Sequence, residues 1–278
     1  MANGIRILTV FLMVFITVSS CQKDNSPAPV VPPTDLTLNY GDSIFYLQNQ
    51  SSDYIIAPTQ SKPGIYTGFP EGIDIDGSTG AINISKSETG LRYRITFKAD
   101  GATDSISTLI LISGINFLDG FYKLNTADSV AKPIYNARNT NAIPGTNNGS
   151  VFDEGSNCNG AGCKVDVSSG TINLAQTVRN GVFGSTPSNN DRKEFLMNYR
   201  INDKSGKALN TLKVKLYYFD SINDVTQEVY DIISSRQGTL LRYNSLSYEP
   251  LSNFRPSGTA GVSKPSKPRP PCIFILAR

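Results

Sequence analysis

The chain has 278 residues, with 26 Lys and Arg against 23 Asp and Glu, and it contains neither His nor Trp. An apolar fraction of 39% is too high for a disordered chain, and a net charge of +3 is too small for a protein that binds nucleic acid through phosphate contacts. Without histidine, Ser-His-Asp and Cys-His catalysis and His-ligated zinc sites are excluded. The length provides for one or two domains with a substantial buried core.

Residues 1–20 have the pattern of an export signal. Arg6 is the single charge in this stretch, residues 7–18 are almost all apolar, and two serines precede Cys21. Such an apolar run is too short to span a bilayer stably. The segment 18–21, Val-Ser-Ser-Cys, resembles a bacterial lipobox, which implies cleavage before Cys21 and diacylation of that cysteine. The alternative is an ordinary secretory signal with an incidental cysteine.

Residues 21–34 predict a tether between the lipid and the first domain. Gln22-Lys23-Asp24 resembles the Lys-plus-acid signal that sends some outer-membrane lipoproteins to the cell surface, although a solvated spacer explains it equally well. Residues 25–34 carry four prolines and should form an extended, semi-rigid spacer. We therefore expect a lipid-anchored outer-membrane protein whose first partner is the membrane. Both alternatives, display at the cell surface and a periplasmic position, stay open.

Four blocks of sequence recur in the same order, which argues for an internal duplication. Several of these blocks alternate apolar and polar residues with a period of two, as half-exposed strands of antiparallel sheets do. Turns rich in Gly, Asn, Asp and Ser separate the strands, which is typical of a β-sandwich. The blocks are 38–44 with 124–130, 73–84 with 165–174, 93–95 with 199–201, and 108–109 with 211–212.

Residues 69–82 carry a family resemblance. The segments 69–76, Phe-Pro-Glu-Gly-Ile-Asp-Ile-Asp, and 79–82, Thr-Gly-Ala-Ile, resemble the immunoglobulin-like and cadherin-like modules of bacterial surface proteins. The resemblance covers residues 35–114 and reaches the second copy through the repeat. It implies an all-β fold with two tandem immunoglobulin/cadherin-like β-sandwich modules, at 35–114 and 115–278.

The second module should carry one short helix and a C-terminal extension. Residues 221–237 have apolar side chains at helical spacing, which predicts an amphipathic helix packed on the module. The apolar run 272–276 should pair as a last strand, because an exposed apolar strand invites aggregation.

Cadherins proper bind calcium through clustered acids, so the resemblance makes Asp74 and Asp76 calcium candidates. Calcium needs six to eight oxygen ligands, and the Asp-rich linker motif of true cadherins is missing here. We therefore favour solvated turn acids over a calcium site, and we expect no metal and no cofactor.

The cysteines after Cys21 predict one local disulfide. Cys158 and Cys163 are separated by four residues, two of which are glycines, and an exported chain enters a compartment that permits disulfides. A metal site is poorly supported, because three cysteines without histidine are an incomplete ligand set. Cys272 should be a buried free thiol.

Four Asp-Ser-Ile/Val tripeptides resemble an O-glycosylation sequon of some Gram-negative exported proteins. An alternative is a strand-entry turn in which Asp and Ser accept backbone hydrogen bonds. The serines concerned are Ser43, Ser105, Ser129 and Ser221.

The sequence predicts a binding protein and not an enzyme. No nucleophile elbow, P-loop, dinucleotide fingerprint or HExxH motif is present, and nothing singles out carboxylates such as Asp153, Glu154 or Glu194 as a glycosidase pair. We expect a binding or adhesion module with a polysaccharide or protein ligand, and the Asn/Gly-rich loop 131–163 with Tyr135 is the candidate contact. The alternative is a structural spacer or an accessory subunit of an outer-membrane complex.

Overall fold

The computed structural model describes residues 37–126, 129–137, 143–144, 149–236 and 269–278. The predicted signal peptide 1–20, the tether 21–34 with Cys21, and most of the C-terminal extension lie outside the described residues. No helix within the described ranges is long and apolar enough to cross a membrane. Thr37–Arg278 form one compact unit.

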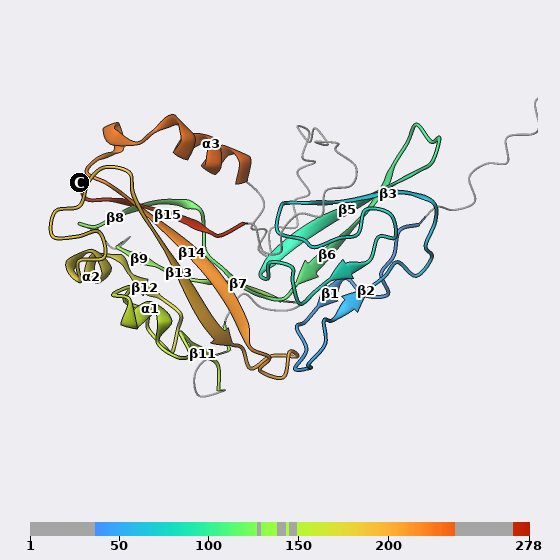
Figure 1. Cartoon of the computed structure of the whole chain (residues 1–278), viewed down its shortest axis with the longest axis horizontal. Helices are drawn as coiled ribbons and strands as arrows, with labels where there is room; N and C mark the ends of the chain where they lie inside the picture. Colours follow the sequence, from blue (N-terminus) through green and yellow to red (C-terminus); the bar gives the residue numbers. More distant parts are fainter. Residues whose placement is uncertain (1–36, 127–128, 138–142, 145–148, 237–268) are drawn as a thin grey trace, which may run out of the picture. The chain divides into compact units, whose positions relative to one another are not determined.

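The first module is a sandwich of a four-stranded and a two-stranded sheet (Figure 1). In its central strand β5, Leu91, Tyr93, Ile95 and Phe97 are buried and alternate with polar residues, so one face of the sheet covers the core. The larger sheet has the order β1-β6-β5-β3 and the smaller pairs β2 with β4. The strands are β1 (Ile44–Phe45), β2 (Ile55–Ile56), β3 (Gly64–Phe69), β4 (Ile82–Asn83), β5 (Leu91–Ala99) and β6 (Ile106–Ile112).

The second module repeats this plan with a five-stranded sheet in the order β11-β13-β14-β15-β8. Two short sheets, β12 with β9 and β10 with β7, complete it. Together with the first module, they confirm the predicted all-β architecture of two sandwiches. The strands are β7 (Gly114–Asn116), β8 (Gly120–Lys123), β9 (Val130–Ala131), β10 (Ile134–Asn136), β11 (Val151–Phe152), β12 (Ile172–Asn173), β13 (Asp191–Arg200), β14 (Asn210–Phe219) and β15 (Cys272–Leu276).

The C-terminal strand β15 lies inside the sheet, not at its edge. It runs parallel to β14 on one side and to β8 on the other, and all five of its residues are buried. In the first module the corresponding outer strand β1 pairs directly with β6, also in parallel. The last strand is thus confirmed, but both large sheets are mixed and not purely antiparallel, because β1 runs parallel to β6 in one and β15 runs parallel to β8 and β14 in the other.

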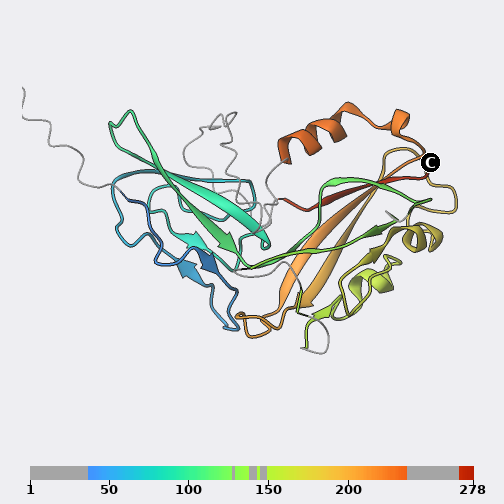
Figure 2. The same ribbon diagram turned by 180° about the vertical axis from the view of Figure 1, so that it is seen from behind.

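Helices cover both faces of the five-stranded sheet (Figures 1 and 2). On one face, Cys158 of α1 and Leu174 of α2 join the sandwich core with Ile273 and Ile275. On the other face, Val229 of α3 packs with alternate residues of β14 and β15. The helices are α1 (Asn157–Gly160), α2 (Leu174–Arg179), the 3₁₀ turn η2 (Ile222–Asp224) and α3 (Gln227–Arg236).

The helix predicted over 221–237 is present in a shorter form. Val225 adopts an extended conformation and separates η2 from α3, which ends at Arg236. Helix α2, which follows β12 directly, was not predicted from the sequence. The side chain of Asn173 caps α2 by accepting a hydrogen bond from the backbone N–H of Gln176 at 2.8 Å.

The internal repeat holds for strands better than for residue positions. Bridges join Ile75 to Ile82 and Val165 to Ile172. The turn residue Asp166 therefore corresponds to Asp76, whereas the sequence blocks had matched it with Asp74. The turn geometry sets this register, whereas the alternating Ile-Asp pattern matches equally well two residues earlier. The first block does not correspond at all, because β1 pairs with β6 while β9 pairs with β12.

Candidate functional site

Buried hydrogen bonds join the two sandwiches. The Nδ2 atom of Asn210 donates to Thr89 Oγ1 at 2.8 Å and to the hydroxyl of Tyr199 at 2.5 Å, and that hydroxyl lies 2.7 Å from Thr89 Oγ1. The Nδ2 atom of Asn136 donates to the carbonyl of Gly90 at 2.7 Å. These groups belong to different modules, so the two modules satisfy each other's buried polar atoms at the junction. The junction therefore favours one fixed arrangement.

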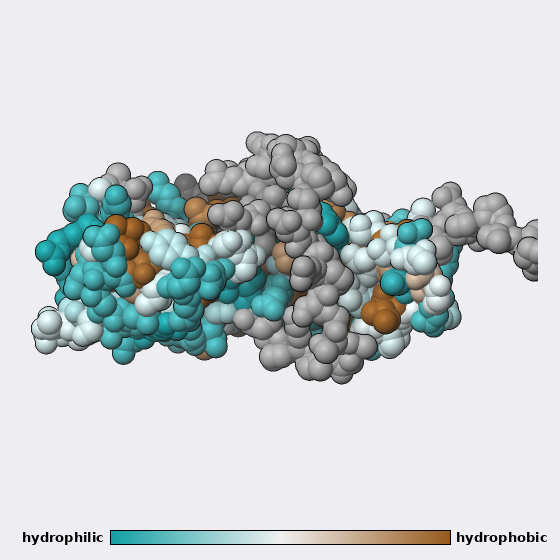
Figure 3. All heavy atoms as spheres, turned by 90° about the horizontal axis from the view of Figure 1, so that it is seen from above, coloured by the Kyte–Doolittle hydropathy of each residue, from teal (hydrophilic) through white to brown (hydrophobic). Residues whose placement is uncertain are grey.

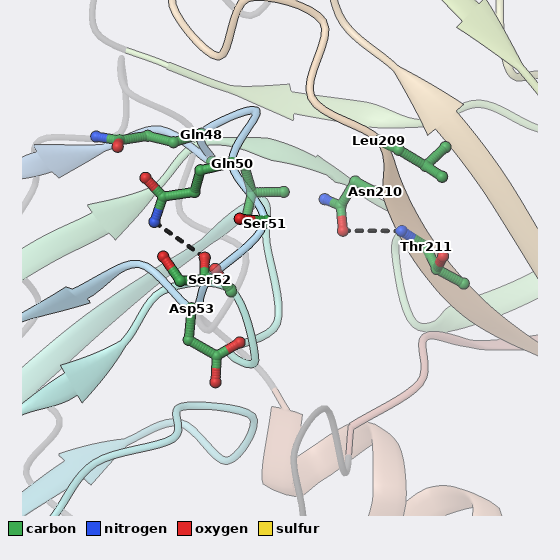
Figure 4. Close-up of a pocket in the computed structure, with 10 residues that line it drawn as sticks. Gln48, Gln50, Ser51, Ser52, Asp53, Leu209, Asn210 and Thr211 are labelled. Atoms are coloured by element: carbon green, nitrogen blue, oxygen red, sulfur yellow. Dashed lines mark hydrogen bonds between the residues drawn. The ribbon is translucent and has the colours of Figure 1, made fainter.

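A polar cleft of about 240 Å³ lies next to this junction. One wall is the loop that follows β1, and the other is the start of β14 (Figure 4). Asn210 belongs both to the cleft and to the buried junction, so the position of one wall depends on the hydrogen bonds described above. The lining residues are Leu47, Gln48, Gln50, Ser51, Ser52, Asp53, Ser85, Leu209, Asn210 and Thr211.

Several polar side chains of the cleft have unused hydrogen-bonding capacity. Gln48, Ser51 and Ser52 are exposed, and within the described residues their side-chain polar atoms make no hydrogen bond. Gln50 donates through Nε2 to the carbonyl of Ser52 at 3.0 Å, which leaves its Oε1 as an acceptor (Figure 4). Amides and hydroxyls offer both donors and acceptors, so this wall can bind a ligand that presents both.

The cleft contains one ionisable side chain, and its charge is compensated. Asp53 forms an ion pair with Lys86 Nζ at 2.8 Å and accepts a hydrogen bond from Asn83 Nδ2 at 2.8 Å. The bond from Lys86, followed by that from Asn83, holds the pKa of Asp53 below its usual value. Leu209 adds an apolar surface that is 50% exposed. The cleft thus combines neutral hydrogen-bonding groups with one small apolar wall.

One of the two calcium candidates, Asp76, is engaged in turn structure. Asp76 Oδ1 accepts hydrogen bonds from Ser78 Oγ at 2.7 Å, from the N–H of Ser78 at 2.8 Å and from the N–H of Thr79 at 2.9 Å. These bonds, led by that of the Ser78 hydroxyl, lower the pKa of Asp76 to about 2. Asp166 repeats the arrangement in the second module. No cluster of three potential metal ligands occurs in the described ranges, and Asp76 is part of a turn, the alternative that we favoured for it.

Tyr135 cannot serve as the contact residue expected in loop 131–163. It lies in β10, is only 2% exposed, and donates through its hydroxyl to Asp203 Oδ2 at 2.8 Å. The expectation was wrong because the segment forms a strand that turns this side chain into the core. Residues 138–142 and 145–148 of the loop lie outside the described residues.

The cysteines of the second module are free thiols in the structure, and all three are buried. The predicted bridge is therefore not formed here, although the backbone N–H of Cys163 donates to the carbonyl of Cys158 at 2.9 Å. Cys272 is 2% exposed and accepts a hydrogen bond from Arg236 Nη1 at 3.1 Å. The expectation of a buried free thiol at Cys272 agrees with this.

The four serines of the Asp-Ser-Ile/Val tripeptides differ in exposure. Ser43 and Ser105 are exposed, whereas Ser129 and Ser221 are half-buried. Asp42 Oδ1 accepts hydrogen bonds from two following N–H groups, at 2.6 and 3.2 Å, which is the strand-entry turn given as the alternative. O-glycosylation of these serines stays a prediction. Ser43 and Ser105 are the most accessible of the four.

The carboxylates considered for a glycosidase pair have structural partners. Asp153 binds the backbone N–H groups at the start of α1, at 2.8 and 2.9 Å. Glu154 Oε2 pairs with Arg200 Nε at 2.6 Å, and Glu194 Oε2 lies 3.4 Å from Lys213 Nζ. Each of these carboxylates thus has a charged or backbone partner within the second module. The face shown in Figure 3 is mostly hydrophilic among the described residues, with hydrophobic residues in small separate groups.

No family model and no curated protein matches the sequence. Among solved structures, two crystal structures of human Protocadherin-24 EC1-2 are similar, with 8% and 6% sequence identity. Each comparison covers 65% of this chain and 94% of that chain, with TM-scores of 0.20 and 0.22. Since TM-scores this low carry no argument, the description of the fold as two all-β sandwiches rests on the strand order given above.

Proposed function

We propose that this protein is a non-catalytic binding or adhesion module of the cell envelope, anchored in the outer membrane through lipid on Cys21, with a glycan as its ligand. The observation that carries the ligand class is the neutral, hydrogen-bonding cleft beside the module junction. The lipobox-like sequence before Cys21 and the Pro-rich tether support the anchor.

The chemistry of the cleft favours a glycan over a charged ligand. Sugar hydroxyls both donate and accept, and the amides of Gln48 and Gln50 with the hydroxyls of Ser51 and Ser52 can pair with them in either sense. The one carboxylate, Asp53, is already paired with Lys86, so the cleft offers no uncompensated charge to an anionic or cationic ligand. Leu209 can pack against the C–H surface of a sugar ring.

The ligand proposal can be tested by native gel electrophoresis of the chain from residue 24 in gels that contain one polysaccharide each. A binding polysaccharide should retard the protein, and free oligosaccharide should abolish the retardation. The double variant Gln48→Ala, Gln50→Ala should migrate freely, while Gln60→Ala, a matched exposed glutamine outside the cleft, should behave as wild type. Retardation that is equal in all three proteins would exclude the cleft as the site.

The anchor is tested separately on the full chain. Wild-type protein should incorporate labelled palmitate and fractionate with the outer membrane, and Cys21→Ser should lose both properties. Protease added to intact cells then distinguishes surface from periplasmic display. A Cys21→Ser protein that still carries palmitate would contradict the anchor without affecting the ligand proposal.

A structural spacer or accessory subunit is the second candidate, and the buried junction favours it. Hydrogen bonds among Thr89, Tyr199 and Asn210 join the two sandwiches, and a spacer of fixed length needs such a junction. A spacer should cross-link to an outer-membrane protein and should ignore every polysaccharide in the gels.

A further inference from the structure

We propose that Cys158 and Cys163 are a modification site, oxidised in the mature protein to an intramolecular disulfide, while Cys272 stays a thiol. This inference is independent of the ligand proposed for the cleft. It rests on the fold of one turn, on the burial of both sulfur atoms, and on the position of the sheet between this pair and the third cysteine.

The backbone already brings the two cysteines together. α1 is a single turn, and the chain folds back after it so that the N–H groups of Ala161 and Cys163 both donate to the carbonyl of Cys158, at 3.1 and 2.9 Å. These bonds close the chain between the two cysteines into one tight turn, and a disulfide needs Cα atoms about 4.4–6.8 Å apart. Cys163 is the leading cause of the raised pKa of the Cys158 thiol, as expected if the two thiols face each other.

The turn is fixed at both ends by polar side chains. Asp153 accepts hydrogen bonds from the N–H groups of Cys158 and Asn159 at 2.8 and 2.9 Å. The side chain of Asn159 binds Val165 through both its amide nitrogen and its oxygen, at 3.0 and 3.1 Å. The turn that carries both cysteines is therefore held in place by neighbouring side chains.

Cys272 is separated from this pair by the five-stranded sheet. Cys158 and Cys163 belong to the core on one face, with Ile273 and Ile275. Cys272 belongs to the cluster on the opposite face, under Val229 of α3. Because successive residues of a strand point to opposite faces, Cys272 cannot reach the pair without leaving the sheet.

The reaction is thiol–disulfide exchange with an external disulfide, from a protein or a small molecule. The thiolate of one cysteine attacks that disulfide, forms a mixed disulfide and releases the first external thiol. The thiolate of the second cysteine then displaces the other external thiol and closes the bridge. The two cysteines lose two protons and two electrons, and the oxidant leaves as two thiols. Burial leaves the folded pair inaccessible, so we expect exchange before the core closes.

The experiment is refolding of the full chain with excess oxidised glutathione, followed by denaturation, alkylation and tryptic mass spectrometry. Residues 139–164 contain both cysteines and no internal Lys or Arg, so one peptide reports on the pair. We expect this peptide without alkyl groups and lighter by two hydrogen atoms, and the Cys272 peptide fully alkylated. Reduction before alkylation should place two alkyl groups on residues 139–164.

Two variants make the assignment specific. Cys272→Ser should retain the light peptide, whereas Cys163→Ser should expose Cys158 to alkylation. Reductant should lower the melting temperature of wild type and of Cys272→Ser but leave Cys163→Ser unchanged. Two alkyl groups on residues 139–164 of wild type after refolding in excess oxidised glutathione, or a cross-link to Cys272, would overturn the proposal even if Cys163→Ser fails to fold.

Discussion

The inserted strand β15 should contribute strongly to stability, and Phe274→Ala tests this. Phe274 is fully buried, and its ring centroid lies 4.8 Å from that of Tyr217 and 5.8 Å from that of Phe121. Loss of a fully buried phenylalanine costs about 3–5 kcal/mol. That is a large part of the roughly 5–15 kcal/mol by which a typical domain is stable.

The assay is urea unfolding followed by circular dichroism, with thermal unfolding alongside. For a folded part of this size we expect a fall in melting temperature of about 10 °C, from roughly 2–4 °C for each kcal/mol. The control is Leu196→Ala on β13 of the same sheet, because Leu196 is 50% exposed and should change the free energy of unfolding by less than about 0.5 kcal/mol. If Phe274→Ala costs no more than Leu196→Ala, β15 does not pack in the sheet as described.

Three further predictions concern buried or charged groups. Tyr199→Phe should cost about 1–3 kcal/mol in urea unfolding, because Asn210 and the junction lose a buried partner, while the matched exposed Tyr230→Phe should cost almost nothing. Asp119→Ala should cost about 3–5 kcal/mol, because Asp119 pairs with two buried or half-buried arginines, at 2.7 and 2.9 Å, that would keep their charge. The pKa of Asp76 is about 2 in the folded state against an ordinary 3.8. Its contribution to the free energy of unfolding is therefore present above pH 3.8 and is lost as the pH falls towards 2. An NMR titration of Asp76 with a midpoint at 3.8 would refute the turn described.

The sequence predicted what depends on local periodicity. Alternation identified β5 and β14, and the apolar run 272–276 identified β15. It could not place β15 between β8 and β14, because the order of strands in a sheet depends on pairings between distant segments. The same limit applied to the repeat, where the turn at Asp76 and not the Ile-Asp pattern fixed the register.

The candidate site was harder to predict than the fold. Tyr135 was chosen because loop 131–163 is polar and a tyrosine can stack on a sugar, but β10 directs it into the core. The cleft contains residues from 47–53 and 209–211, which the chain brings together only through the junction of the modules. A run of exposed amides and hydroxyls at 48–52 was the one sequence signal, and without the second wall it looks like any polar loop.

The most direct test of the account is binding at the cleft. Wild-type protein and the Gln48→Ala, Gln50→Ala variant should be compared in native gels across neutral and acidic polysaccharides. The account predicts retardation of the wild type by a neutral polysaccharide, and free migration of the variant with an unchanged melting temperature. Wild-type protein that migrates freely in every neutral gel, or a variant that is retarded as strongly as the wild type, would contradict it.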